Sequence, residues 1–336
     1  FAQEGQPLKI SGYLETYYTY DFNRPSSNKR PDFIYSHNRH NEVNVNLAFI
    51  KANYQTENVR TNLALALGTY MTANYSAEAD VMKNAFEANA GIKLTKNANL
   101  WLDAGIFSSH IGFESAISKD CWVLTRNISS ENTPYFETGA KITYATEDQK
   151  LSATLLYLNG WQRIKRVDGN SKPAGGLQLT YKPSDKITLN YSNYLGYEGE
   201  DAVRTQRFYH NFYGIFQLSE SFGLTAGFDY GKQQIAKGSK TKKEILSPVL
   251  IARYAFAENW AVAGRYEYYK DTMIVNSTNA DGFKVSGYSL NIDYSPIKNA
   301  MLRLEGKIYQ GDEQFIRNTR SVDYNSSIST SLAISF

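Results

Sequence analysis

The sequence predicts an all-β fold: a transmembrane, antiparallel, up-and-down β-barrel of about sixteen strands, in a single domain over residues 1–336. Three observations support this prediction. Long segments alternate apolar and polar residues with a period of two, which is the period of a β-strand. Short and long polar connections follow one another in turn. Charged residues fall on only one of the two faces of each segment.

The clearest segment covers residues 322–336. Its apolar residues occupy one face and its polar residues the other: Val322, Tyr324, Ile328, Leu332, Ile334 and Phe336 against Asp323, Asn325, Ser327, Ser329, Ser331 and Ser335. In a soluble sandwich a strand is usually about half this long. This length suits a strand that crosses a bilayer at a tilt and protrudes a little. We expect this closing strand to turn its apolar face to lipid and its serine-rich face to a wet interior.

The composition of the 336-residue chain is compatible with a membrane barrel. No run of roughly 18 apolar residues occurs, which excludes a helical membrane protein. Alternation dilutes the hydrophobic fraction of a barrel, and here that fraction is 42%. The 26 tyrosines and 8 prolines favour strands that meet membrane interfaces. The net charge of +3, from 36 basic and 33 acidic residues, is too balanced to suggest a nucleic-acid partner.

The first segments of the chain begin the same pattern. Residues 8–22 form the expected opening strand, which should pair with the closing strand. Residues 23–41 form a polar and mainly basic connection, and residues 42–55 form the second strand. The alternation in that second strand loses its phase after Ile50, which predicts a β-bulge there.

Short and long connections then alternate to the end of the chain. We expect short turns near residues 56–58, 96–97, 147–149, 184–185, 219–221, 258–259 and 296–298. We expect long connections at residues 23–41, 73–84, 109–134, 162–172, 198–205, 236–243, 272–282 and 312–321. These connections join sixteen strands and place both termini at the short-turn, periplasmic end. A barrel of about this size encloses water, whereas one of about eight strands is filled by side chains.

Charged residues indicate which face of each strand meets the interior. A basic side chain on the lipid face near the midplane costs roughly 2–4 kcal/mol, so several of them would exceed the stability of an ordinary domain. We therefore assign the charged face to the lumen wall. The residues assigned to it are Arg60, Glu87, Lys93, Asp103, Glu137, Lys141, Arg265, Glu267, Arg303, Glu305 and Lys307. Segregated charges would create a field across the pore, and interleaved charges would brace the wall.

The longest connection, residues 109–134, is the main functional candidate. It contains several large apolar residues that need burial, although the segment joins two membrane strands. We expect it to fold into the lumen, pack on the wall and narrow the pore. Its charged residues would then border the constriction and set the electric field there: Glu114, Lys119, Asp120, Arg126 and Glu131. The alternative is an extracellular cap packed on neighbouring loops or on a partner.

Three segments of the chain carry a family likeness: residues 36–42, 104–115 and 131–141. They resemble the OmpL-like class of outer-membrane β-barrel porins of Gram-negative bacteria. The resemblance implies an exported barrel that forms a porin. A C-terminal aromatic residue also resembles the feature by which the barrel-assembly machinery takes up its clients, and Phe336 matches it.

Together these features predict a passive, water-filled channel for small polar solutes in the bacterial outer membrane. The alternative is a plugged or accessory barrel that binds another outer-membrane or envelope protein. Outer-membrane lipid and lipopolysaccharide are the expected surroundings, and the basic connection at residues 23–41 suits the anionic lipopolysaccharide. A start at Phe1 without an initiator methionine fits a mature protein whose signal peptide has been cleaved.

The sequence predicts no enzyme, no cofactor and no metal site. A hydrolase site needs a base beside a nucleophile, and only 4 histidines are present. His110 follows Ser108 and Ser109, but neighbouring residues on a strand point to opposite faces. His37 and His40 lie in a polar loop without a carboxylate at a matching distance.

Overall fold

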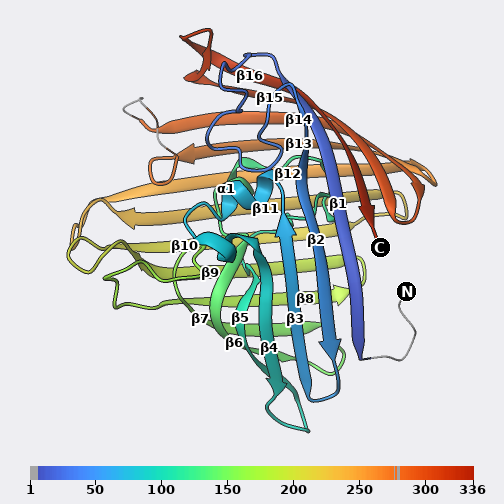
Figure 1. The fold of residues 1–336 in the computed structure, drawn as a ribbon, viewed down its shortest axis with the longest axis vertical. Coiled ribbons are helices and arrows are strands. Elements are labelled where there is room, and N and C mark those ends of the chain that lie inside the picture. The colour runs from blue at the N-terminus through green and yellow to red at the C-terminus, as the bar shows by residue number, and fades with distance from the viewer. Residues whose placement is uncertain (1–6, 276, 278–280) are drawn as a thin grey trace.

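The computed structural model describes residues 7–275, 277 and 281–336. It contains a closed barrel in which sixteen antiparallel strands follow one another in chain order (Figure 1). The barrel closes between β1 (Leu8–Asp21) and β16 (Arg320–Ser335), where Leu14 pairs with Ile334. The all-β class, the strand number and the pairing of the first strand with the last are therefore confirmed.

The remaining strands have the following bounds: β2 (Val43–Gln55), β3 (Val59–Leu67), β4 (Ala85–Lys93), β5 (Asn99–Ser108), β6 (Phe136–Ala145), β7 (Leu151–Leu158), β8 (Ala174–Ser184), β9 (Ile187–Glu198), β10 (Thr205–Gln217), β11 (Phe222–Gln234), β12 (Lys242–Ala257), β13 (Trp260–Asp271), β14 (Phe283–Ile297) and β15 (Ala300–Arg317). The helices are α1 (Thr69–Asn74) and α2 (Ile128–Glu131), with short 3₁₀ turns η1 (Asp80–Asn84) and η2 (Ser118–Asp120). Within the described part of the chain, neither helix is long and apolar enough to cross a membrane.

One expected long connection is wrong. Residues 312–321 are not a loop, because β15 continues to Arg317 and β16 starts at Arg320. Only Asn318 and Thr319 lie between them, with φ of 46° and 68°. Two consecutive residues at positive φ make a tight turn whose twist matches the two strands it joins. The polar composition suggested a loop, but a hairpin that extends beyond the bilayer tolerates polar residues on both faces.

The expected bulge is also misplaced. The register between β1 and β2 shifts at Asn46, because Glu15 pairs with Leu47 while Thr16 pairs with Val45. The extra residue turns its side chain into the barrel, where Asn46 is fully buried. Its amide donates to the Glu15 carboxylate at 2.9 Å and accepts the His37 backbone N–H at 2.9 Å. The bulge therefore re-aims a polar side chain inward.

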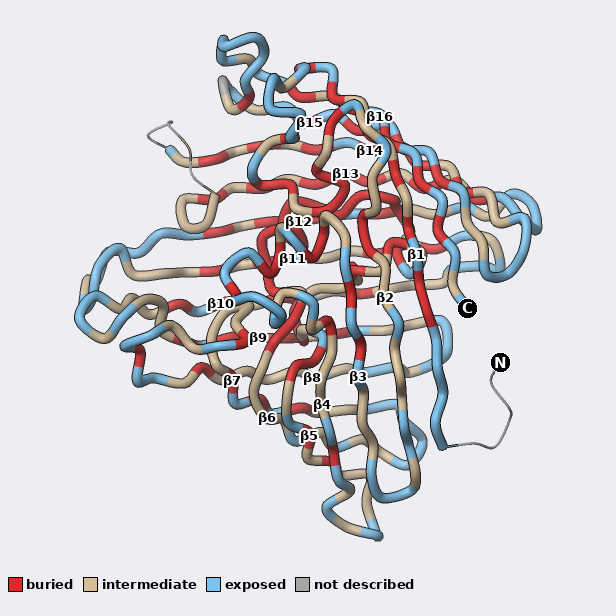
Figure 2. The backbone as a smooth tube through the Cα atoms, viewed as in Figure 1, coloured by how far each residue is buried: buried red, intermediate tan, exposed pale blue. Residues whose placement is uncertain are grey.

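Side-chain exposure alternates along the strands as the sequence predicts. In β15, Arg303 and Lys307 are 2% and 3% exposed, whereas Leu302 and Leu304 between and beside them are 42% and 45% exposed. Buried residues gather midway along the strands and in the segments inside the barrel (Figure 2). Charged residues therefore face the interior, and leucine and isoleucine cover the outside.

This orientation gives a first test by mutation. We expect Leu290→Arg, at an outward position 65% exposed in the middle of β14, to destabilise the barrel by about 2–4 kcal/mol. The matched change Ile297→Arg, at the short-turn end of the same strand, should cost only about 0–1 kcal/mol because an arginine there reaches the membrane interface. Urea unfolding in lipid vesicles measures both. Equal costs would contradict the assigned lipid face.

Candidate functional site

The segment of residues 109–134, called here the inner loop, is bonded to inward-facing side chains of the barrel wall. Carboxylates of the wall accept its backbone N–H groups: Glu305 accepts from Thr125 at 2.6 Å, and Glu267 accepts from Ile128 at 2.5 Å. Ser129 donates its hydroxyl to Asp229 at 2.8 Å. Hydrogen bonds to ionised acceptors are stronger than neutral ones, so these contacts fix the loop against β11, β13 and β15.

Basic residues of the wall bind the carbonyl oxygens of the same loop. Arg303 donates to the carbonyls of Ser118 at 2.6 Å and Cys121 at 3.0 Å, while its other N–H groups hold Asp293 at 2.7 and 3.1 Å. Arg265 donates to the Thr125 carbonyl at 2.7 Å. The wall thus supplies both donors and acceptors to a loop without regular strand pairing, and this satisfies the loop's buried backbone groups.

Lys307 completes this set of wall contacts. Its ammonium donates to the Arg126 carbonyl at 2.9 Å and lies 3.2 Å from Glu267. Arg265 in turn lies 3.4 Å from Glu305 and 3.4 Å from Glu267. Four charged residues predicted for the lumen wall on these strands, Arg265, Glu267, Glu305 and Lys307, therefore lie in one interleaved network beneath the inner loop, while the fifth, Arg303, pairs with Asp293.

The apolar residues of the inner loop account for its burial. Val123, Leu124 and Ile128 have no exposed surface. Val123 packs with Val249 and Ile251 of β12. Burying side chains of this size stabilises the packed position by roughly 1.5–3 kcal/mol each. Apolar packing and the charged network act on the same segment and hold it in one place.

The charged residues that the sequence places at a constriction divide into two groups. Glu114, Arg126 and Glu131 are buried and bonded: Glu114 accepts the Asn127 N–H at 2.6 Å, and Arg126 donates to the Ser115 carbonyl at 2.5 Å. Lys119 is half-buried, and Asp120 is exposed. These last two keep contact with water, whereas the first three hold the loop together.

Glu131 connects the inner loop to a second inward-folding segment that the sequence did not predict. Its carboxylate accepts the backbone N–H groups of Tyr35 and Ser36, both at 3.0 Å. Burial raises the pKa of Glu131, and the N–H bond from Ser36 opposes that rise. Phe33 and Ile34 beside them are buried. This short apolar run inside the polar connection 23–41 is the sequence feature that indicates its inward fold.

The same connection is tied to β1. His37 Nε2 lies 3.2 Å from Glu15 Oε1, and both side chains are fully buried. The Glu15 carboxylate also accepts the Ser118 hydroxyl of the inner loop. A single carboxylate on β1 thus joins the two segments inside the barrel. The helix α1 packs nearby, where Tyr75 stacks on Phe136 with ring centroids 4.0 Å apart.

The wall formed by β2 to β6 carries charges that pair with residues two strands away. Lys51 lies 2.7 Å from Glu87, and Arg60 lies 2.6 Å from Asp103. The Lys51 and Arg60 side chains remain 26% and 27% exposed although they point inward. These pairs are interleaved along the wall, so their charges largely cancel, and water reaches them.

Three further residues predicted for this wall have different surroundings. The Lys141 ammonium lies over the Phe107 ring at 4.4 Å. Lys93 is half-buried at the short-turn end of β4. Glu137 is fully buried, and neither of its carboxylate oxygens has a hydrogen-bond partner in the described part of the chain.

His110 at the start of the inner loop gives a pH prediction. Burial of the ring lowers the pKa of His110 to about 4, although the hydrogen bond between Nε2 and the Asn193 carbonyl, at 2.7 Å, opposes that fall. In the unfolded chain this histidine binds a proton near pH 6.5, whereas in the folded protein it stays neutral down to about pH 4. The unfolding free energy therefore falls as the pH drops from about 6.5 to about 4.

We expect the unfolding free energy to be about 2 kcal/mol lower near pH 5 than near pH 7.5 on account of this histidine. The His110→Gln variant should show a correspondingly flatter dependence in urea unfolding. An unchanged pH dependence in that variant would contradict a buried neutral histidine.

Comparison with known proteins agrees with this architecture. The anion-selective porin from Comamonas acidovorans matches with a TM-score of 0.63 at 10% identity, over 98% of this chain and 99% of that one. The outer-membrane channel DcaP of Acinetobacter baumannii matches with a TM-score of 0.65 at 11% identity, over 100% and 99%. OmpT of Vibrio cholerae matches with a TM-score of 0.63 at 10% identity, over 100% and 99%. At these identities the likeness shows the fold alone.

The sequence comparisons are more specific. A search of curated proteins found no match. The family described as "Putative beta-barrel porin-2, OmpL-like" matches residues 7–336, nearly the whole chain. This description as a β-barrel porin agrees with the closed sheet and its apolar outer face. The protein is thus an integral outer-membrane β-barrel and belongs to the OmpL-like β-barrel porin-2 family.

Proposed function

We propose that the protein is a porin that lets small polar solutes diffuse passively through a water-filled lumen. The observation that carries this proposal is the partial exposure of charged pairs inside the barrel. Lys51 and Arg60 point inward, yet about a quarter of each side chain meets water. In a barrel sealed by its own side chains, such groups would be completely buried. Burying a charge is far more costly than leaving it in contact with water, so partly exposed charges favour a lumen that contains water.

The inner loop narrows this lumen. Glu305, Glu267 and Arg303 hold its backbone on the wall of β13 and β15. On the other side, Ala116 packs with Leu47 and Ala64 of β2 and β3, near the long-loop end. The part of β2 to β5 nearer the short turns is left to line the water path, where the paired charges of Lys51 with Glu87 and Arg60 with Asp103 give a polar but nearly balanced surface.

Swelling of liposomes tests this proposal directly. Purified protein reconstituted into multilamellar vesicles should admit small sugars at rates that fall with molecular size, because a fixed constriction sieves by diameter. Vesicles without protein are the control. Equal exclusion of all sugars by vesicles that contain folded barrel would contradict passive diffusion.

The water-facing charges of the inner loop should set the preference between cations and anions. Asp120 is exposed, so we expect Asp120→Lys to shift the chloride-to-potassium permeability ratio upward by roughly two-fold or more. The matched change Glu57→Lys alters the same charge in an exposed short turn and should leave the ratio close to that of the wild type. Reversal potentials under a KCl gradient measure both. A larger effect from Glu57→Lys would contradict the assignment.

The accessory role is a second candidate, because two segments besides the inner loop also fold into the barrel. Residues 33–37 and α1 are largely buried there. A barrel plugged by these segments would bind another envelope protein instead of conducting. Folded protein that admits no sugar but is captured with a defined envelope partner would favour this candidate.

Export and assembly follow from the same proposal. The protein would reach the outer membrane of a Gram-negative cell by way of a cleaved signal peptide. Phe336 would serve as the recognition residue for the barrel-assembly machinery, and this residue is 72% exposed. The exposed basic residues of the connection 23–41, Arg24 and Lys29, would meet lipopolysaccharide on the outer surface.

A further inference from the structure

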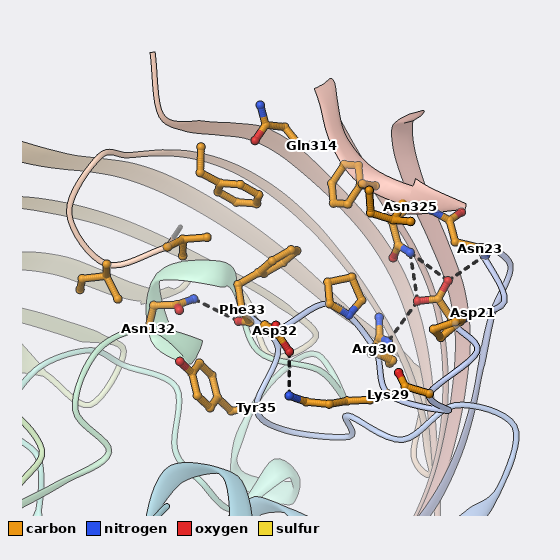
Figure 3. Close-up of a pocket in the computed structure, with 18 residues that line it drawn as sticks. Asp21, Asn23, Lys29, Arg30, Asp32, Phe33, Tyr35, Asn132, Gln314 and Asn325 are labelled. Atoms are coloured by element: carbon orange, nitrogen blue, oxygen red, sulfur yellow. Dashed lines mark hydrogen bonds and ion pairs between the residues drawn. The ribbon is translucent and has the colours of Figure 1, made fainter. Parts of the chain in front are cut away.

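A cavity of about 580 Å³ lies between the connection 23–41 and the long-loop ends of β14, β15 and β16. This volume falls in the range of about 300–1,000 Å³ that small-molecule sites occupy. Figure 3 places Asp21, Arg30 and Asn325 together along one wall, with Phe33 and Asn132 across from them. The cavity is therefore polar on one side and apolar on the other.

Arg30 is the main feature of the polar wall. Its side chain is 1% exposed, and only Nη2 has a hydrogen bond, to the Ser327 hydroxyl at 2.8 Å. Nε lies 3.9 Å from the Asp21 carboxylate, beyond hydrogen-bonding distance. Neither Nε nor Nη1 has an acceptor among the described residues. A buried guanidinium with two unused nitrogens is costly, and a ligand carboxylate would supply the missing acceptors.

Two side-chain amides beside Arg30 lack a hydrogen-bond donor to their oxygen atoms. Asn325 donates from Nδ2 to both oxygens of Asp21, at 2.9 and 3.0 Å, and Asn23 donates from Nδ2 to the Tyr324 carbonyl at 3.0 Å. These bonds fix the orientation of both amides. They leave the Oδ1 atoms of Asn23 and Asn325 without a donor in the described structure. The same wall therefore has unused acceptors as well as unused donors.

The opposite wall is aromatic. The Phe33 ring lies 4.9 Å from Phe283 and 6.3 Å from Phe315, and all three residues line the cavity. Their rings come from the connection 23–41, β14 and β15. Such a surface fits a flat or branched apolar group, with ring contacts at the distances that aromatic pairs prefer.

We propose that this cavity binds a zwitterionic α-amino acid with an aromatic or large apolar side chain. The ligand carboxylate takes the free nitrogens of Arg30, its ammonium donates to the free oxygens of Asn23 and Asn325, and its side chain lies on the ring of Phe33. These nitrogens and oxygens are themselves buried, so the side chains of Arg30, Asn23 and Asn325 must turn toward the cavity when the ligand binds.

The charge balance of the wall favours this ligand class over a simple anion or cation. Arg30 and Asp21 carry opposite charges 3.9 Å apart, so the wall has no net charge. A ligand with only a carboxylate meets Asp21 as a like charge, and a ligand with only an ammonium meets Arg30 in the same way. A zwitterion meets each group with the opposite sign. At the rim, Lys29 and Asp32 form their own pair at 2.7 Å and add no net charge.

Isothermal titration calorimetry of the purified full-length protein in detergent micelles tests the proposal with four probes. These are L-phenylalanine, 3-phenylpropionate without the ammonium, phenethylamine without the carboxylate, and glycine without the apolar group. We expect L-phenylalanine to bind at least about ten-fold more tightly than each of the other three, since each lacks one set of contacts. Titration into protein-free micelles subtracts partitioning of the aromatic probes.

Variants then locate the site. We expect Arg30→Gln to weaken L-phenylalanine binding at least about ten-fold. Arg24→Gln, an exposed arginine of the same connection outside the cavity lining, should bind as the wild type does. A heat-induced shift in gel mobility checks that each variant is folded, and if Arg30→Gln does not fold, the four-probe comparison on the wild type decides.

Equal binding of 3-phenylpropionate and L-phenylalanine, absence of L-phenylalanine binding, or equal losses in both arginine variants would overturn the proposal. The binding assay does not depend on conduction. A barrel that binds L-phenylalanine without admitting sugars would refute the passive channel and leave this site intact.

Discussion

Replacing Arg303 by methionine is expected to release the inner loop and raise single-channel conductance by roughly two-fold or more. Arg303 binds the carbonyls of Ser118 and Cys121 and also neutralises Asp293. Its loss leaves a buried carboxylate unpaired, which typically destabilises a protein by about 3–5 kcal/mol. Planar-bilayer recordings measure the conductance, and urea unfolding measures the stability.

The control for this prediction is Arg60→Met. Arg60 binds Asp103 through two bonds of 2.7 and 2.6 Å, so the ion pair resembles that of Arg303, but within the described residues Arg60 makes no hydrogen bond or ion pair with the inner loop. Removing it should leave the loop in place, and channel noise from loop motion should stay at the wild-type level. If both variants raised conductance and noise equally, loss of wall charge and not release of the loop would be the cause.

Replacing residues 113–126 by a short Gly-Ser linker is expected to give the larger increase in conductance. This change removes the packed body of the inner loop, including Val123 and Leu124, and opens the wall of β10 to β16 to water. The barrel should still form, because its strand pairs do not involve the loop. We expect single-channel conductance to rise roughly three-fold or more, in proportion to the widened cross-section.

A matched replacement of residues 236–240 by the same kind of linker controls for the effect of replacing a loop. These residues are mostly exposed in the connection between β11 and β12. Their replacement should leave conductance unchanged. An unchanged conductance after replacement of 113–126, in protein that is folded by gel mobility, would place the constriction elsewhere.

The barrel could be predicted from sequence because a single physical rule acts at every strand position. Alternate residues meet lipid and the interior, and a misplaced charge such as Arg303 is expensive at a lipid-facing position. That rule gives the strands, their inward faces and the closure between β1 and β16. It fails at residues 312–321, where a two-residue turn at Asn318 and Thr319 continues the hairpin outside the bilayer and the penalty no longer applies.

The interior of the barrel was less predictable, because its contacts join distant parts of the chain. Glu305 binds Thr125 and Arg303 binds Ser118 across more than half of the sequence, and no local period encodes such pairs. The charge of Arg126 is compatible both with a water-lined constriction and with a buried network. The contacts of Arg126 with the carbonyls of Ser115, Leu124 and Ala116, at 2.5, 2.7 and 3.3 Å, distinguish them.

The inward fold of the connection 23–41 had a weak signal. Phe33 and Ile34 stand in a basic and polar stretch, and their burial carries Tyr35 and Ser36 to Glu131. Two apolar residues are too few to predict such a path, since isolated exposed apolar residues are common on protein surfaces. The cavity beside Arg30 exists because of this path.

Single-channel recording of the wild-type protein in planar bilayers tests the central claim most directly. A water-filled lumen narrowed by the inner loop predicts discrete, uniform conductance steps when folded protein inserts. Repeated insertion of protein with the gel mobility of a folded barrel, without any conductance step, would contradict a channel.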